Sequence, residues 1–184
     1  DALLVYGTAT ADELRKIELV SGSWINDAAI TTTRTTGTVE WVELTSRPGS
    51  NQIGIAYSDT NDDVSAYRWD GTTAANEATA AITLTAVAGD VRKMDVSFEG
   101  TSGDMLVAAP VSAAGTTALG QLVGTTWTIT ANTGPDMVTA FIDLQEPNPA
   151  DNDIAMIAHG VTAAGANTME GYEWSGTGLT DGTV

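Results

Sequence analysis

Cysteine is absent from this sequence of 184 residues, and histidine occurs once, as His159. The lack of cysteine excludes disulfides, a thiol nucleophile and thiolate-bound zinc, and a single histidine excludes a histidine cluster as a metal site. A general-base role for His159 would need a positioned nucleophile, and the sequence signals none. We therefore expect His159 to be structural or exposed.

Basic residues are scarce as well. Seven Lys and Arg stand against 24 Asp and Glu, which gives a formal net charge of −17 at pH 7. A field of this sign repels nucleic acid and anionic lipid, so neither is expected as a partner. No apolar run approaches the roughly 20 residues of a membrane-spanning helix, so no membrane insertion is expected. The acidic, cysteine-free composition suits an extracellular or cell-surface location.

What the chain does have is an internal repeat. Four apolar runs begin at equivalent positions: Asp1, Gln52, Asp104 and Asp153. A glycine close to a tryptophan follows each run: Gly22, Gly71, Gly124 and Gly176. Successive copies lie 49 to 53 residues apart, and a fixed period of this length is the sequence signature of a repeat architecture.

Within each unit the pattern is that of β-strands, because short apolar or alternating runs are separated by clusters of Gly, Asn, Asp, Ser and Pro. We read four strands per unit, and the second, almost purely aliphatic strand predicts burial on both faces. Four antiparallel strands in about 50 residues make one propeller blade. The glycine would allow the turn between strands three and four to take a positive φ. A β-sandwich is the main competitor, but sandwiches need no fixed period.

The prediction is thus an all-β chain forming a β-propeller of about four four-stranded blades of about 50 residues each. We expect a single repeat domain over residues 1–184, with units at about 1–38, 39–91, 92–138 and 139–184. Residue 1 aligns with the start of a second strand, so the first blade is incomplete. Because open blades leave exposed edges, either four blades close with an incomplete first blade, or the chain is part of a larger ring, or subunits complete one another by strand exchange. A larger or self-associated assembly is favoured over a free monomer.

Two further residue types keep the period. An acid between apolar neighbours recurs as Glu43, Asp95 and Asp143. Convergent carboxylates would suit glycoside hydrolysis, but repetition in successive units favours a scaffold role, such as a bond to the backbone of a neighbouring blade. The sequence also contains five tryptophans. Trp24, Trp69, Trp127 and Trp174 keep the period, and we expect them in the core between blades or as sugar-stacking surfaces, whereas Trp41 stands outside this register.

One cofactor site is suggested by spacing alone. Asp59, Asn61 and Asp63 alternate as oxygen ligands do in calcium loops. The alternative is a polar hairpin turn, which favours the same residues, and no glutamate follows at EF-hand spacing. These three residues therefore form either a calcium site or a polar hairpin turn, and no other cofactor is expected.

With these anchors in place, the chain resembles a class of bacterial and archaeal extracellular repeat proteins whose blades carry Asp-Val-x-Phe-Glu, Ser-Gly-Asp and Trp-Asp-Gly elements. The matching stretches are residues 95–99 (DVSFE), 102–104 (SGD) and 69–71 (WDG). The resemblance implies a propeller-like fold and an outside location, and no reaction.

The predicted function is that of a non-enzymatic extracellular structural or interaction module, such as a surface or filament component. The alternative is a carbohydrate-binding, lectin-like propeller, or an inactive relative of a glycan hydrolase. In that alternative, tryptophans and loops would hold a glycan.

Overall fold

The computed structural model describes residues 2–8, 13–31, 37–61, 64–69, 94–110, 116–124, 126–133, 137–162 and 167–182. Within these ranges every regular element is a β-strand, which confirms the all-β prediction for the described part of the chain. No helix among these residues is long and apolar enough to cross a membrane.

The strands form four small sheets, each built from one continuous stretch of chain. Sheet 1 contains β1 (Ala2–Gly7), β2 (Glu13–Val20) and β3 (Ser23–Thr31), and sheet 2 contains β4 (Val39–Ser46), β5 (Ile53–Asp59) and β6 (Val64–Trp69). Sheet 3 contains β7 (Asp95–Phe98), β8 (Met105–Pro110), β9 (Thr116–Val123) and β10 (Thr126–Thr133). Sheet 4 contains β11 (Met137–Leu144), β12 (Ile154–Thr162), β13 (Asn167–Trp174) and β14 (Leu179–Gly182).

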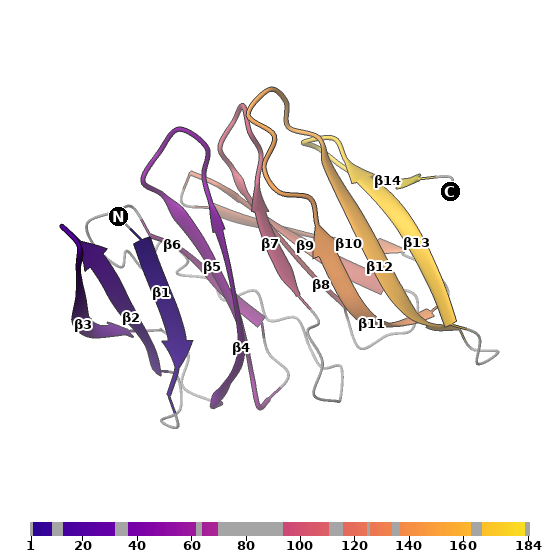
Figure 1. The fold of residues 1–184 in the computed structure, drawn as a ribbon. Helices are drawn as coiled ribbons and strands as arrows, with labels where there is room; N and C mark the ends of the chain where they lie inside the picture. Colours follow the sequence, from indigo (N-terminus) through magenta and orange to yellow (C-terminus); the bar gives the residue numbers. More distant parts are fainter. Residues whose placement is uncertain are drawn as a thin grey trace.

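Every sheet is an antiparallel meander in which consecutive strands are paired. The four sheets stand side by side in chain order, with sheets 1 and 4 at opposite ends of the row, so the described strands form no closed ring (Figure 1). Sheet 1 begins with β1, the equivalent of β5, β8 and β12, and so lacks a counterpart of β4, β7 and β11. The predicted fourth strand of the second unit, at residues 82–86, lies outside the described residues.

The core fills the spaces between sheets, and β8 shows how. Alternate side chains of a strand point to opposite faces. Met105, Val107 and Ala109 belong to a cluster with residues of sheets 1 and 2. Leu106 and Ala108 belong to a second cluster with sheet 4. Each aliphatic side chain buried in this way contributes about 1.5–3 kcal/mol, so the apolar run of β8 fixes its place between two neighbours.

The prediction of double burial holds for β5 and β8 but is wrong for β1, where Leu4 is 48% exposed, and for β12. In β12, Ile154, Met156 and Ala158 are buried whereas Ala155 and Ile157 are exposed. The reason is position: sheet 4 stands at the end of the row, so only one of its faces is covered by a described neighbour (Figure 1).

Two local predictions can be checked at the end of each third strand. Gly22, Gly124 and Gly176 all have positive φ, between 61° and 82°, as the predicted turns require; Gly71 lies outside the described part. Trp174 is buried and Trp69 and Trp127 pack against the core, as predicted. Trp24 is 58% exposed, which contradicts its predicted place in the core. It lies on sheet 1, the other end of the row (Figure 1).

Candidate functional site

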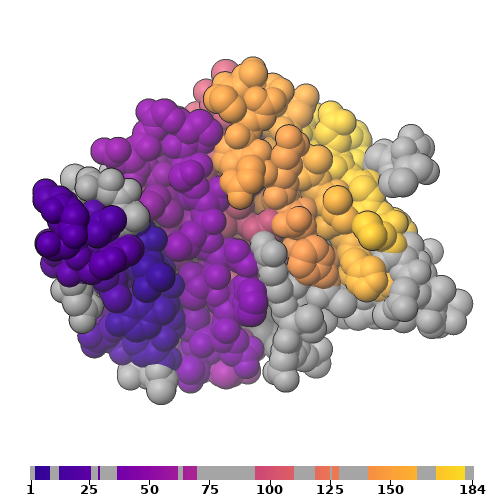
Figure 2. Space-filling model, in the orientation of Figure 1, coloured from indigo at the N-terminus to yellow at the C-terminus, as the bar shows by residue number. Residues whose placement is uncertain are grey.

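Neighbouring sheets meet along three contacts, which we call the first seam (sheets 1 and 2), the second seam (sheets 2 and 3) and the third seam (sheets 3 and 4). The space-filling view shows sheet 1, in indigo, packed directly against sheet 2, in violet (Figure 2). The seams bring together side chains from units far apart in sequence, so they are where a site made by the repeat would lie.

The third seam is held by the recurring acid. Asp95 Oδ2 accepts a hydrogen bond from the backbone N–H of Leu144 on sheet 4 at 2.6 Å, and Asp95 Oδ1 accepts from Val96 N at 2.9 Å. Beside it, Ser97 Oγ donates to the carbonyl of Gln145 at 2.7 Å. The predicted scaffold role, a bond to a neighbouring backbone, is confirmed for Asp95.

The other two recurring acids behave differently. Glu43 accepts a hydrogen bond from Trp41 Nε1 at 2.6 Å within its own strand, which also accounts for the one tryptophan outside the repeat register. Asp143 is exposed on sheet 4. The three acids therefore stand on three different sheets.

A second buried carboxylate lies deeper in the third seam. Glu99, 2% exposed, follows β7 and receives Trp174 Nε1 at 2.7 Å and Gln121 Nε2 at 2.9 Å on the same oxygen, Oε1. Ser102 Oγ donates to its other oxygen at 2.5 Å. A buried charge is tolerated when its hydrogen-bonding capacity is used in this way. Sequence reasoning missed this role, although Glu99 is part of the repeated Asp-Val-x-Phe-Glu element.

Backbone contacts close the same seam at its turns. The N–H of Gly100 donates to the carbonyl of Asp151 at 3.0 Å. The N–H groups of Thr101 and Ser102 both donate to Asn152 Oδ1, at 3.0 and 2.9 Å. The turn between β7 and β8 is thus fastened to the turn between β11 and β12, which closes the third seam around Glu99.

One strand position reaches across the second and third seams. The residue opposite the second residue of β1, β5, β8 or β12 is, in turn, Glu18, Arg68, Gln121 and Glu173. Arg68 donates across the second seam to the carbonyl of Gly124 at 2.7 Å, and Gln121 across the third to that of Gly176 at 3.4 Å. An ionised glutamate only accepts hydrogen bonds. The first seam therefore has an acceptor, Glu18, at the position where the second and third seams have a donor.

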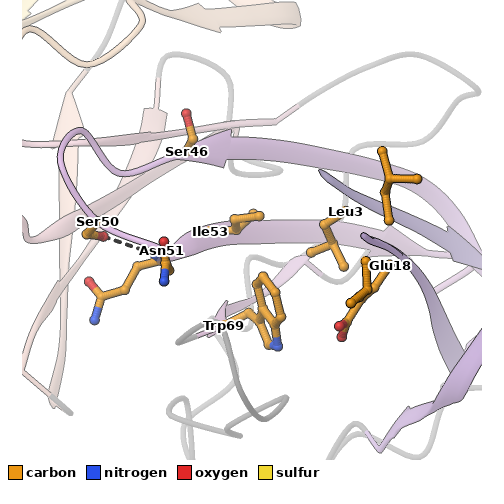
Figure 3. A pocket seen from close by; sticks show the side chains of 10 residues that line it. Leu3, Glu18, Ser46, Ser50, Asn51, Ile53 and Trp69 are labelled. Atoms are coloured by element: carbon orange, nitrogen blue, oxygen red, sulfur yellow. Dashed lines mark hydrogen bonds between the residues drawn. The ribbon is translucent and has the colours of Figure 1, made fainter. Parts of the chain in front are cut away.

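The first seam holds a cavity of about 260 Å³. Figure 3 shows its side chains: Leu3, Ile53 and Trp69 line its apolar side, while Glu18 and Asn51 bring polar atoms. Serines and Gln52 from the β4–β5 turn, with Leu19 and Val20 from the end of β2, complete the wall. An apolar wall facing a polar one is the usual character of a site for a small polar organic ligand.

The indole of Trp69 is the most telling group in this cavity. Its Nε1 is buried and has no hydrogen-bond partner among the described residues. A buried polar group without a partner costs about 1–3 kcal/mol, so most such groups are satisfied by protein, water or ligand. The ring itself is held in place, since Lys16 Nζ lies 5.3 Å from its centroid. Lys16 also forms an ion pair with Glu18, which orients that carboxylate.

The predicted calcium residues lie at the end of β5, on sheet 2. Asp59 is 1% exposed, and its Oδ1 accepts the backbone N–H of Asn61 at 2.9 Å, as in an Asx turn. Asp63 lies outside the described residues. Within the described ranges no three His, Cys, Asp or Glu side chains are grouped so that they could hold a metal ion. Calcium at this turn stays a prediction.

His159 is half-buried on β12, where it is paired with Phe141 and Met169. It belongs to sheet 4, whereas the cavity belongs to the first seam. Among the described side chains that line the cavity, Glu18 is the carboxylate.

No protein-family model matches the sequence, and no curated protein sequence matches it significantly. Among solved structures, the chain is similar to a lectin of Aleuria aurantia, in a mutant complexed with Fucα1-6GlcNAc, at 16% identity and a TM-score of 0.53. The alignment covers 98% of this chain and 56% of the lectin. A second structure of that lectin, described as a six-bladed β-propeller with a novel fucose recognition mode, gives 16% identity, a TM-score of 0.51 and coverages of 98% and 55%.

The likeness shows a propeller-type fold. At this identity it speaks for the arrangement of the sheets and not for the ligand. The chain spans just over half the length of the lectin that it matches.

Proposed function

We propose that this chain is a non-enzymatic, carbohydrate-binding propeller module, and that the cavity in the first seam is its glycan site. The observation that carries the proposal is Trp69, whose side chain lines this cavity and whose buried Nε1 has no partner among the described residues. A sugar hydroxyl would accept this N–H, while the apolar wall would contact the less polar face of the ring. The fold shared with fucose-binding lectins supports the same function.

The test is glycan-array screening followed by calorimetric titration of the best ligand, with and without calcium. We expect Trp69→Phe, which keeps the ring but removes the N–H, to weaken binding about tenfold, the effect of one well-placed hydrogen bond. Trp174→Phe is the matched control, since it removes the equivalent N–H in the closed third seam and should leave affinity unchanged. A lack of binding to any glycan would overturn the proposal.

A second function, self-association as part of a surface or filament assembly, is favoured by the two end faces of the row. Ile157 and Met169 on sheet 4 are 45% and 66% exposed, and Leu4 on sheet 1 is 48% exposed. On sheet 3 the positions equivalent to Ala155 and Ile157 are Leu106 and Ala108, and both are fully buried beneath sheet 4. No described residue covers the surface of sheet 4 that corresponds to the surface of sheet 3 buried beneath sheet 4.

We propose that a second copy covers this face, in the extracellular setting that the composition favours. Light scattering should give a mass above that of the 19.0 kDa monomer. Met169→Lys should restore the monomer, because it introduces a charge into the contact. A monomer at all concentrations would contradict self-association without affecting the glycan site.

A further inference from the structure

The recurring acid of the repeat makes different contacts on sheets 2 and 3. Asp95 Oδ2 accepts the backbone N–H of Leu144 across the third seam at 2.6 Å. The residue of sheet 3 equivalent to Leu144 is Val96, because each directly follows the recurring acid of its own unit. The N–H of Val96 is already bound, at 2.9 Å, by Asp95 Oδ1 of the same strand. The N–H that Glu43 would bind across the second seam is therefore taken.

Glu43 contacts an exposed tryptophan of its own strand instead. Trp41 Nε1 donates to Glu43 Oε1 at 2.6 Å, while Trp41 is 43% exposed. Ser58 and Ala56 stand directly opposite these two residues on β5, and both have small side chains. The one polar group of the indole is thus bound, so Trp41 offers the π surface of its ring to the solvent.

The backbone beside Trp41 is irregular. A β-bulge lies between Val39 and Trp41, which makes Glu40 an extra residue in the pairing of β4 with β5. Bulges re-aim the side chains next to them and are common beside functional sites. Sheet 4 has the same bulge, between Thr139 and Phe141, so an aromatic residue follows the bulge in both sheets. Because phenylalanine has no N–H, a bond from ring to carboxylate is possible at this position of sheet 2 and not of sheet 4.

The indole and its carboxylate favour a cationic ligand. The face of an aromatic ring carries partial negative charge, and tryptophan attracts cations more strongly than the other aromatic side chains do. Glu43 adds a full negative charge at the edge of the same ring, and the chain as a whole carries −17. An anion would be repelled by all three. An organic ammonium group is attracted by all three, and its C–H groups can also contact the ring.

We propose that Trp41 and Glu43 form a surface site for organic ammonium cations of the choline type. The cation lies on the exposed surface of the indole, and Glu43 supplies the charge that attracts it. Both residues belong to β4 of sheet 2, which has a described sheet on either side, so the site is not part of an end face (Figure 1). It shares no residue with the cavity of the first seam and does not depend on glycan binding.

The experiment compares choline with neohexyl alcohol, the neutral isostere in which carbon replaces the charged nitrogen. Heteronuclear NMR spectra follow the indole N–H signal of each tryptophan, and Trp41→Phe identifies the Trp41 signal by its loss. At pH 7 and low salt, choline should shift this signal in a saturable way, and the alcohol should bind at least about threefold more weakly. Trp24 is the internal comparison, because at 58% exposed it would respond more than Trp41 if exposure alone decided binding.

Glu43→Gln tests the contribution of the charge. Its amide oxygen can still accept the indole N–H, so the ring keeps its place while the negative charge is lost. Choline binding should weaken about two- to fivefold, the usual worth of an exposed ion pair, and binding of the alcohol should not change. Asp143→Asn, the corresponding change at the equivalent exposed acid of sheet 4, is the matched control and should alter neither affinity.

Three results would overturn the proposal: a Trp41 signal that choline does not move, equal affinities for choline and the alcohol, or a stronger response at Trp24 than at Trp41. Unchanged choline affinity in Glu43→Gln would contradict the role of Glu43. Should that variant fail to fold, as judged by its thermal transition, sodium chloride added to the unmodified chain replaces it. Salt should weaken the binding of choline and not that of the alcohol, and an equal effect on both would contradict a charged site.

Discussion

The first and third seams share their second and third strands, but only the third has a strand in the place of β7; the first contains a cavity and the third is closed. Both place a tryptophan from one sheet near a polar side chain from its neighbour. In the third seam Glu99 fills the space between them and receives both donors. In the first seam the corresponding space is a cavity and the indole N–H is left without a described partner.

The difference teaches that a repeat can supply both scaffold and binding site from one set of positions. Where the chain provides its own acceptor, the position stabilises the contact between sheets. In the first seam, where the described strands include no counterpart of β7, the indole N–H of Trp69 has no described partner. Function in such a fold resides in the departures from the repeat, because residues that keep the repeat are occupied in holding the sheets together.

The largest expected effect comes from removing the Glu99 carboxylate from the third seam. Glu99→Ala removes the acceptor shared by Trp174, Gln121 and Ser102, and should lower the free energy of unfolding by about 3–5 kcal/mol. Urea denaturation followed by tryptophan fluorescence measures this loss. Glu146→Ala, at an exposed residue, is the control and should stay within about 0.5 kcal/mol of the parent. If Glu99→Ala loses no more stability than the control does, the carboxylate of Glu99 does not stabilise the third seam.

The next effect separates the recurring acids from one another. Asp95→Ala removes the carboxylate that binds the backbone of Leu144 across the third seam, and should cost about 1.5–3 kcal/mol. Asp143→Ala, at the equivalent position of sheet 4, should cost less than Asp95→Ala, because interactions of an exposed carboxylate are weakened by solvent. Equal losses in the two variants would contradict the idea that the seam, rather than the residue type, makes the acid important.

Much of this scaffold can be predicted from the sequence, because the residues that form it recur at the same position of successive repeats. The aliphatic runs predict the second strands, the glycines predict positive-φ turns, and the acid of the Asp95 series predicts a bond to a neighbouring backbone. These features depend on the residue itself and on its nearest neighbours along the strand.

The cavity could not be predicted in the same way. Its lining comes from separate stretches of sheets 1 and 2, which lie together only in the folded strand arrangement. Glu99 follows a strand, where an acid is ordinarily solvated, so nothing local marks it as buried. Trp24 keeps the glycine–tryptophan spacing but is exposed, since spacing along the chain does not tell whether a face has a covering sheet.

A smaller effect tests the two tryptophans directly. Trp174→Phe leaves Glu99 with one donor fewer and should reduce stability by about 1.5–3 kcal/mol, the usual worth of a hydrogen bond to a charged group. Trp69→Phe removes an N–H that has no described partner, so its stability should be equal to the parent's or slightly higher. Thermal denaturation of the two variants in parallel measures the contrast. If Trp69→Phe is as destabilised as Trp174→Phe, the indole of Trp69 has a structural partner and the first seam is not an open version of the third.

The smallest effect would convert the third seam into a binding site. Glu99→Ala leaves Trp174 Nε1 and Gln121 Nε2 as two donors around a space that a carboxylate has vacated, so acetate should bind there and restore part of the lost stability. At a free acetate concentration equal to its dissociation constant the gain is about 0.4 kcal/mol, and it grows with concentration as binding to the native state requires.

Sodium chloride at the same ionic strength is the control for screening. The parent chain should gain nothing from acetate beyond this control, because Glu99 already fills the third seam and Glu18 repels an anion from the first. Equal gains in parent and variant would show that acetate acts through the solvent, and a gain confined to Glu99→Ala would show that the third seam binds a carboxylate once that of Glu99 is removed.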